Sequence, residues 1–109
     1  MKTISHSDKL SARERSIKGR RQRKATNKER ELDQALEAVR AEVLRAIHQH
    51  AAMSTPHHGY AVIQEEVDEL WDEVKADEGR SLRARAEAVQ IAAMGVRYLI
   101  DITPIFSKP

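Results

Sequence analysis

The segment 86–102 most constrains what this chain can fold into, because it is apolar on nearly every side. A helix of that kind is stable only when several neighbours cover it. Its charged and amide side chains form one polar stripe about 80° wide on a helix of 3.6 residues per turn: Glu87, Gln90, Arg97 and Asp101. Buried charges must be paired or bound to a metal. The segment therefore predicts a buried helix whose polar stripe faces charged partners.

The acidic segment 65–73 supplies candidate partners for that stripe. On a helix, its carboxylates lie within an arc of about 120°: Glu65, Glu66, Glu69, Asp72 and Glu73. The apolar residues of the same helix fill the opposite side: Ile63, Val67, Leu70, Trp71 and Val74. Like charges three or four positions apart destabilise a helix by about 0.2–0.5 kcal/mol per pair. A compensating divalent cation is therefore expected.

Capping residues divide the chain into three helices. The first is predicted from about Lys28 to Ala52, with Asn27 as its N-cap. The second begins at Ser54-Thr55-Pro56, a hydroxyl cap followed by proline, and the third covers about Leu82 to Ile102, after a break at Gly79 and a cap at Ser81. The fold class is therefore an all-α antiparallel bundle of three main helices, over residues 29–103, with a C-terminal tail at 104–109.

The first helix has an amphipathic pattern typical of packing. Its apolar positions step by three or four residues: Leu32, Leu36, Val39, Val43 and Ile47. The polar positions Glu31, Gln34, Glu42 and Arg45 are predicted to face solvent. His48 and His50 near its end are candidate metal ligands, but interaction with the helix dipole or solvent is favoured. For His58 and Tyr60, one interpretation is substrate contact at the mouth of a site. The alternative, a poorly ordered polar turn with one half-buried aromatic, is favoured at least as much.

The N-terminal residues 1–28 form a basic arm. Residues 1–30 hold eleven Lys and Arg against three acids, whereas residues 31–109 hold eight against fourteen. The arm contains too few apolar residues to be expected to bury itself in a core. Clustered Arg and Lys at residues 9–28 favour contact with phosphates, of nucleic acid or of a nucleotide. The alternative is a solvated tail, since no aromatic residues alternate with the charges.

Length and cysteine content limit the number of domains, the possible metal ligands and the expected cellular compartment. A chain of 109 residues makes one domain, at a size where oligomerisation often completes the core. It has no cysteine, so any metal must be held by oxygen or imidazole, and a reducing cytoplasm is expected. No apolar run reaches the roughly 18 residues of a membrane span, so membrane insertion is not expected.

The facing carboxylates predict a site for a hard cation. Glu65, Glu66 and Glu69 can point at one volume opposite Glu87 of an antiparallel helix. Oxygen ligands without sulfur favour Mg²⁺, with Mn²⁺ as the alternative, and such Mg²⁺ usually contacts substrate phosphates. The competing interpretation is a solvated acidic face that pairs with Arg83, Arg85 and Arg97. Arg97 itself is expected to pair with a carboxylate of the second helix, with phosphate contact as the alternative.

The order E-E-x-x-E, a spacer of seventeen residues and then E-x-x resembles the all-α nucleoside triphosphate pyrophosphohydrolases of the MazG-like superfamily. The matching residues are Glu65, Glu66, Glu69 and Glu87, and the resemblance covers about residues 30–102. Segments 58–71 and 87–94 also look like small MazG-like proteins of phage and bacterial genomes. Gln90 stands where the family has aspartate.

The resemblance implies an enzyme that hydrolyses a nucleoside triphosphate, or a related nucleotide, to the monophosphate and pyrophosphate. It implies Mg²⁺ held by Glu66, Glu69, Glu87 and Gln90, Glu65 as a further ligand or the catalytic base, and a homodimer or homotetramer. Because a glutamine brings no charge, weak activity or nucleotide binding without turnover is an alternative. A third interpretation is a nucleic-acid-binding protein that acts through its basic arm.

Overall fold

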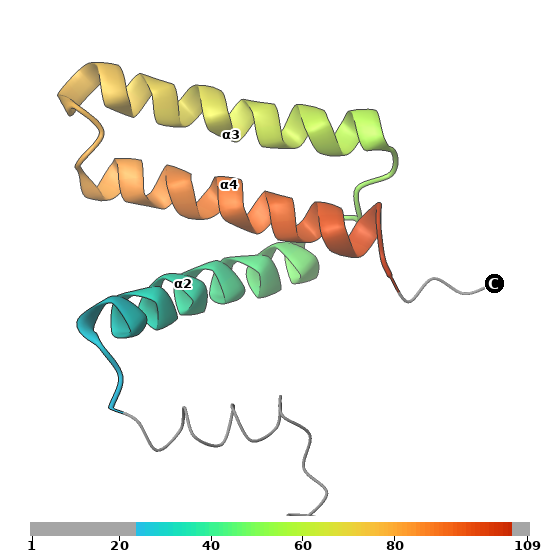
Figure 1. Ribbon diagram of the computed structural model, residues 1–109. Helices are drawn as coiled ribbons and strands as arrows, with labels where there is room; N and C mark the ends of the chain where they lie inside the picture. The colour runs from blue at the N-terminus through green and yellow to red at the C-terminus, as the bar shows by residue number, and fades with distance from the viewer. Residues whose placement is uncertain (1–23, 106–109) are drawn as a thin grey trace, which may run out of the picture. The chain divides into compact units, whose positions relative to one another are not determined.

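The computed structural model describes residues 24–105, which form three α-helices and no strand (Figure 1). Helix α2 covers Asn27–Gln49, α3 covers Pro56–Asp77 and α4 covers Leu82–Asp101. The all-α prediction of three main helices is confirmed. Most of the predicted basic arm, and the tail beyond residue 105, lie outside the described residues. None of the described helices combines the length and the apolarity needed to cross a membrane.

Helix α2 begins with a capping box formed by Thr26 and Glu29, so the N-cap is Thr26 and not Asn27, the residue predicted from the sequence. Thr26 Oγ1 accepts from the Glu29 N–H at 3.1 Å, and Glu29 Oε1 accepts from the Thr26 N–H at 2.9 Å. This reciprocal pair satisfies two donors at the helix start. With Asn27 as the expected cap, Arg30 occupied the third helical position and the box was missed. At the other end, α2 stops at Gln49, three residues before the predicted end.

The predicted caps of α3 and α4 are confirmed. Thr55 Oγ1 accepts from the His58 N–H at 3.0 Å, ahead of Pro56 at the first helical position. Ser81 Oγ accepts from the Ala84 N–H at 3.1 Å. Between the helices, Glu78 and Gly79 both adopt positive φ, 70° and 75°, which ends α3. So short a connection makes α3 and α4 antiparallel neighbours, as Figure 1 shows.

The core lies where α2 crosses α4 and the loop between α2 and α3 closes over them (Figure 1). Its buried members come from α2, the loop and α4: Val43, Ala46, Met53, Ala93 and Met94. Near one end, α3 approaches α4 closely because Gly59 has no side chain. A methyl group on Gly59 would lie 2.7 Å from Tyr98 Cδ2 and 3.2 Å from Met53 Sδ. The backbones of α3 and α4 therefore approach each other closely at Gly59.

Two glycine substitutions should change stability in opposite directions. Gly59→Ala forces the Tyr98 ring out of place, and overpacking of this kind costs about 1–3 kcal/mol. Gly95→Ala, within α4, meets no atom within 4 Å and should stabilise by about 0.5–1 kcal/mol through helix propensity. Urea unfolding of both variants tests this. Equal stabilities would show that α3 and α4 are not in the contact described.

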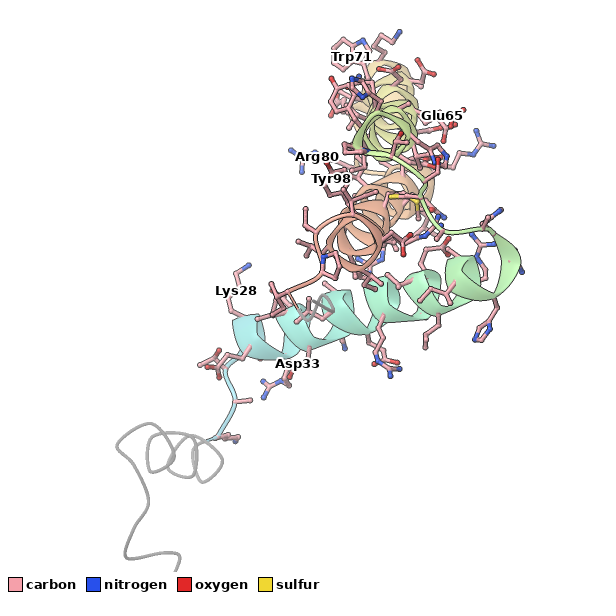
Figure 2. All side chains as sticks on the ribbon, turned by 90° about the vertical axis from the view of Figure 1, so that its right-hand side faces the viewer. Lys28, Asp33, Glu65, Trp71, Arg80 and Tyr98 are labelled. Carbon is pink, nitrogen blue, oxygen red and sulfur yellow. The ribbon has the colours of Figure 1, made fainter. Side chains whose placement is uncertain are left out.

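Large apolar side chains stay uncovered in the single chain. On α2, Leu32 and Leu36 are 55% and 56% exposed, although their spacing predicted packing. On α4, Leu99 is 62% exposed, so residues 24–105 do not bury this helix on all sides as the sequence predicted. Trp71 on α3 is also exposed, at 57%, and Figure 2 shows it on the side of α3 away from Glu65. These faces leave room for a further partner.

Candidate metal site and its cavity

Three carboxylates from two helices converge on one point. Glu66 and Glu69 stand three positions apart on α3, so they lie on the same side of that helix. Glu87 comes from the facing surface of α4. One carboxylate oxygen of each residue lies within 4.8 Å of those of the other two. The predicted convergence of these residues is therefore observed, and the three carboxylates can hold a metal ion.

The carboxylates are electrostatically unfavourable without a cation. Burial, followed by the charges of Glu69 and Glu87, raises the pKa of Glu66 to about 7. Burial and then Glu69 also raise the pKa of Glu87. The Oε1 atom of Glu87 is buried without a hydrogen-bond partner in the described part of the chain. An oxygen in that state is stabilised by a proton or by a metal.

The donor set fits a hard cation. All three groups offer carboxylate oxygen, the ligand type that Mg²⁺ and Mn²⁺ prefer. No other group of histidine, aspartate or glutamate in residues 24–105 comes together in this way. His48 and His50 do not belong to the group of three carboxylates. A solvated acidic face would not account for Glu87 Oε1, which is buried and has no hydrogen-bond partner within residues 24–105.

A cavity of about 570 Å³ opens beside the three carboxylates. Glu65 lines this cavity but does not belong to the converging group, and its side chain is exposed. Its place at the edge of the cavity suits contact with water. Tyr60 does not line this cavity; it is 64% exposed, and its hydroxyl donates to Gln64 at 3.3 Å.

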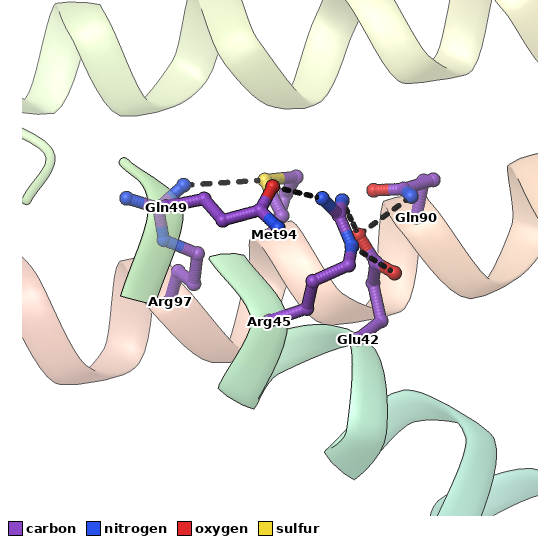
Figure 3. A network of polar contacts seen from close by, with 6 residues as sticks. All are labelled: Glu42, Arg45, Gln49, Gln90, Met94 and Arg97. Carbon is purple, nitrogen blue, oxygen red and sulfur yellow. Dashed lines mark hydrogen bonds and ion pairs between the residues drawn. The ribbon is translucent and has the colours of Figure 1, made fainter. Parts of the chain in front are cut away.

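Gln90 lines the same cavity, but its amide nitrogen is held by α2. Gln90 Nε2 donates to Glu42 Oε2 at 2.7 Å, and Arg45 Nε donates to Glu42 Oε1 at 3.0 Å (Figure 3). The Arg45 guanidinium lowers the pKa of Glu42. Glu42 and Arg45 were predicted to face solvent, and for Glu42 this is wrong because its carboxylate bridges α2 and α4. Only Oε1 of Gln90 is left for a ligand.

Introducing an aspartate at position 90 should therefore destabilise this chain. Gln90→Asp removes the donor to Glu42 and sets a second carboxylate near it, at a cost of about 1–3 kcal/mol. Adding Glu42→Gln supplies a donor again and should recover most of the loss. Urea unfolding in EDTA measures both, with Gln34→Asp on exposed α2 surface as the control. An equal loss in Gln34→Asp would assign the effect to helix propensity.

Arg97 and Asp101 fix the loop that leads into α3. Arg97 Nη2 donates to the Ala51 carbonyl at 2.7 Å, and Asp101 Oδ2 accepts from the Met53 N–H at 2.9 Å. The ion pair of Arg97 is with Asp101, at 3.9 Å on its own helix. The predicted pairing of Arg97 with a carboxylate of α3 is therefore wrong. Of the polar stripe on α4, Arg97 and Asp101 hold the loop, Gln90 bonds to Glu42 of α2, and Glu87 belongs to the carboxylate group.

Comparison of the chain with family models, with curated proteins and with solved structures finds no match. The MazG-like resemblance accordingly rests on the motif residues alone.

Proposed function

We propose that this chain is a Mg²⁺-dependent nucleoside triphosphate pyrophosphohydrolase of the MazG-like type. The observation that carries the proposal is the convergence of Glu66, Glu69 and Glu87 beside a cavity, where Glu87 Oε1 is buried with no hydrogen-bond partner in the described part of the chain. These three residues are also part of the MazG-like motif, whose fourth residue, Glu65, lines the cavity outside the converging group. Sequence motif and geometry thus point to one site.

In this proposal each carboxylate has a role. Glu66, Glu69 and Glu87 hold the cation, and Mg²⁺ there would neutralise phosphate oxygens as substrate binds. Glu65 lines the cavity outside that group, so it can orient a water molecule and take its proton. The water oxygen bonds to the α-phosphorus while the bond from that phosphorus to the bridging oxygen breaks. Pyrophosphate leaves with the bonding electrons, and the nucleoside monophosphate remains.

Pyrophosphate release from a panel of ribo- and deoxyribonucleoside triphosphates tests the assignment, in Mg²⁺, Mn²⁺ or EDTA. Release should need the cation and should be lost in Glu69→Ala. Asp72→Asn is the matched control, because Asp72 is an exposed acid of α3 that pairs with Lys75. Unchanged turnover in Glu69→Ala would remove the assignment.

The chemistry and hydrogen bonding of Gln90 favour a second candidate function, a nucleotide-binding module without efficient turnover. The amide brings no charge, and its hydrogen bond to Glu42 limits its use as a ligand. Mg²⁺-dependent nucleotide binding without pyrophosphate release would support this candidate. The third candidate, nucleic-acid binding through residues 9–28, rests on charge alone and lies outside the described residues. Deletion of residues 1–27 should then abolish a salt-sensitive interaction with DNA or RNA.

We further propose that a homodimer or homotetramer covers the exposed apolar faces. Leu36 on α2 and Leu99 on α4 are more than half exposed, and burial of such side chains stabilises association by about 1.5–3 kcal/mol each. Sedimentation equilibrium should therefore give more than one chain per particle. Leu36→Glu should dissociate the particle, whereas Glu37→Gln beside it should not. A monomeric wild-type chain would contradict the proposal.

A further inference from the structure

The cavity has opposite charges at its two ends. Along α4 it is lined by Glu87, Gln90, Met94 and then Arg97. Glu87 and Arg97 are ten residues apart, which is about 15 Å of helix. Along antiparallel α3 it is lined by His58 at one end and Glu69 at the other. Both helices therefore place carboxylates at one end and nitrogen donors at the other.

The nitrogen-rich end is fixed by the contacts between α3 and α4. Gly59, next to His58, faces the Tyr98 ring, and Tyr98 is next to Arg97. His58 and Arg97 therefore lie at the same end of the helix pair. His50 of the loop and Arg45 of α2 line the cavity as well. Histidine and arginine side chains from four parts of the fold, α2, the following loop, α3 and α4, thus line one cavity.

Arg97 is a buried cation whose hydrogen-bonding capacity is only partly used. Its exposure is 6%, and among described residues its close oxygen partner is the Ala51 carbonyl. The Asp101 carboxylate is 3.9 Å away, beyond hydrogen-bond distance. Nη1 is directed at Met94 Sδ, 3.7 Å away, and a thioether is a weak acceptor (Figure 3). An anionic oxygen in the cavity would be a better partner for Nη1.

His58 has one ring nitrogen available for a ligand. Its Nδ1 accepts from the Ser54 N–H at 3.0 Å, so the proton of the neutral ring is on Nε2. Nε2 is therefore a donor, and the hydrogen bond to Ser54 sets its direction. Arg45 is less free, because Glu42 and Gln49 already accept its hydrogen bonds.

From these contacts we infer that Arg97 and His58 form an anion subsite for a diphosphate group, at the end of the cavity opposite the carboxylates. A guanidinium with free N–H groups matches phosphate oxygens in geometry and charge. The inference rests on the proposed function for its substrate: the β- and γ-phosphates of the nucleotide extend toward Arg97, and pyrophosphate is held there after the bond breaks. Binding of inorganic pyrophosphate itself does not depend on turnover.

Isothermal titration calorimetry with inorganic pyrophosphate, in EDTA and in Mg²⁺, tests the subsite in the full chain. His58→Asn keeps an acceptor for Ser54 but loses the distant donor, and it should weaken binding about tenfold. His58→Gln retains a donor near the Nε2 position and should bind more tightly than His58→Asn. His57→Asn is the matched control, since His57 does not line the cavity. Arg97→Lys should also weaken binding about tenfold, because an ammonium group lacks the paired, planar N–H donors of the guanidinium.

Titrations with nucleotides distinguish the possible outcomes. A nucleoside monophosphate lacks the diphosphate, so its affinity should be the same in His58→Asn and wild type, whereas triphosphate affinity should fall. Circular dichroism verifies that His58→Asn and Arg97→Lys are folded. If both folded variants bind pyrophosphate as tightly as the wild type, the subsite is overturned, whether or not the protein hydrolyses nucleotides. If Arg97→Lys does not fold, the His58 pair decides alone. Pyrophosphate binding that needs His58, without any metal-dependent turnover, would keep the subsite and remove the enzyme assignment.

Discussion

Glu87→Gln should stabilise the metal-free protein and at the same time abolish its response to Mg²⁺. In the wild-type chain Glu87 adds a third carboxylate within 4.8 Å of Glu66 and Glu69, and its Oε1 is buried with no hydrogen-bond partner among residues 24–105. An amide removes this charge, and relief of an unsatisfied buried charged group is worth about 1–3 kcal/mol. For a domain of this size that raises Tm by several degrees. A ligand that binds only the folded state adds stability, so Mg²⁺ should raise Tm only where all three carboxylates are present.

Thermal unfolding at pH 8 in EDTA and in millimolar Mg²⁺ measures both halves of this prediction. Asp72→Asn, which removes an exposed charge of α3 paired with Lys75, is the control and should keep the wild-type response to Mg²⁺. If Glu87 instead stabilised the fold through an ion pair, Glu87→Gln would lower the Tm in EDTA. An equal Mg²⁺ response in Glu87→Gln and wild type would remove Glu87 from the metal site.

Local hydrogen bonding explains how much of the fold could be predicted from the sequence. The caps at Thr55 and Ser81 depend on residues three positions away, so spacing alone predicts them. The start of α2 depends on the same rule, but Thr26 and Asn27 are both good caps. Only the partner of Thr26, Glu29, distinguishes them. The correct start was therefore readable from the sequence but was missed by one residue.

The carboxylate site was predictable because helical period and a short connection determine it. Glu66 and Glu69 share a side of α3 at their spacing, and a tight turn brings α4 back antiparallel. Glu87 then meets them in register. The Glu42–Gln90 hydrogen bond was not predictable in the same way. It depends on the angle at which α2 crosses α4, and the period of α2 shows only that Glu42 is off the apolar stripe.

The burial of α4 shows a second limit of sequence patterns. An apolar residue such as Leu99 predicts a neighbour but does not say whether that neighbour is in the same chain. Within this chain Ala93 and Met94 are buried, whereas Leu99 is 62% exposed. The same pattern therefore contains both the internal core and the face proposed to bind another copy.

The carboxylate site also makes metal binding depend on pH near neutrality. The pKa of Glu66 is raised to about 7, so below that pH the folded metal-free site holds a proton that Mg²⁺ must displace. One such proton weakens Mg²⁺ binding about tenfold for each pH unit below 7, or about a hundredfold between pH 8 and pH 5. Calorimetry in buffers of different ionisation enthalpy should detect proton release. Glu66→Gln should abolish it, and a pH-independent affinity in the wild type would contradict the prediction.

The same proton sets the stability of the metal-free protein. The pKa of Glu66 is about 7 in the folded state, against an ordinary value of 4.5, so between these two pH values the folded state binds more protons than the unfolded state. Stability should therefore fall as pH rises from about 4.5 to 7, and Mg²⁺ should restore it above pH 7. Glu42 acts in the opposite direction, because its pKa is lowered and its contribution is lost only as pH falls below about 4.5. The two carboxylates thus titrate in separate windows, and a pH series of Tm values for Glu66→Gln and Glu42→Gln distinguishes the metal site from the contact between α2 and α4.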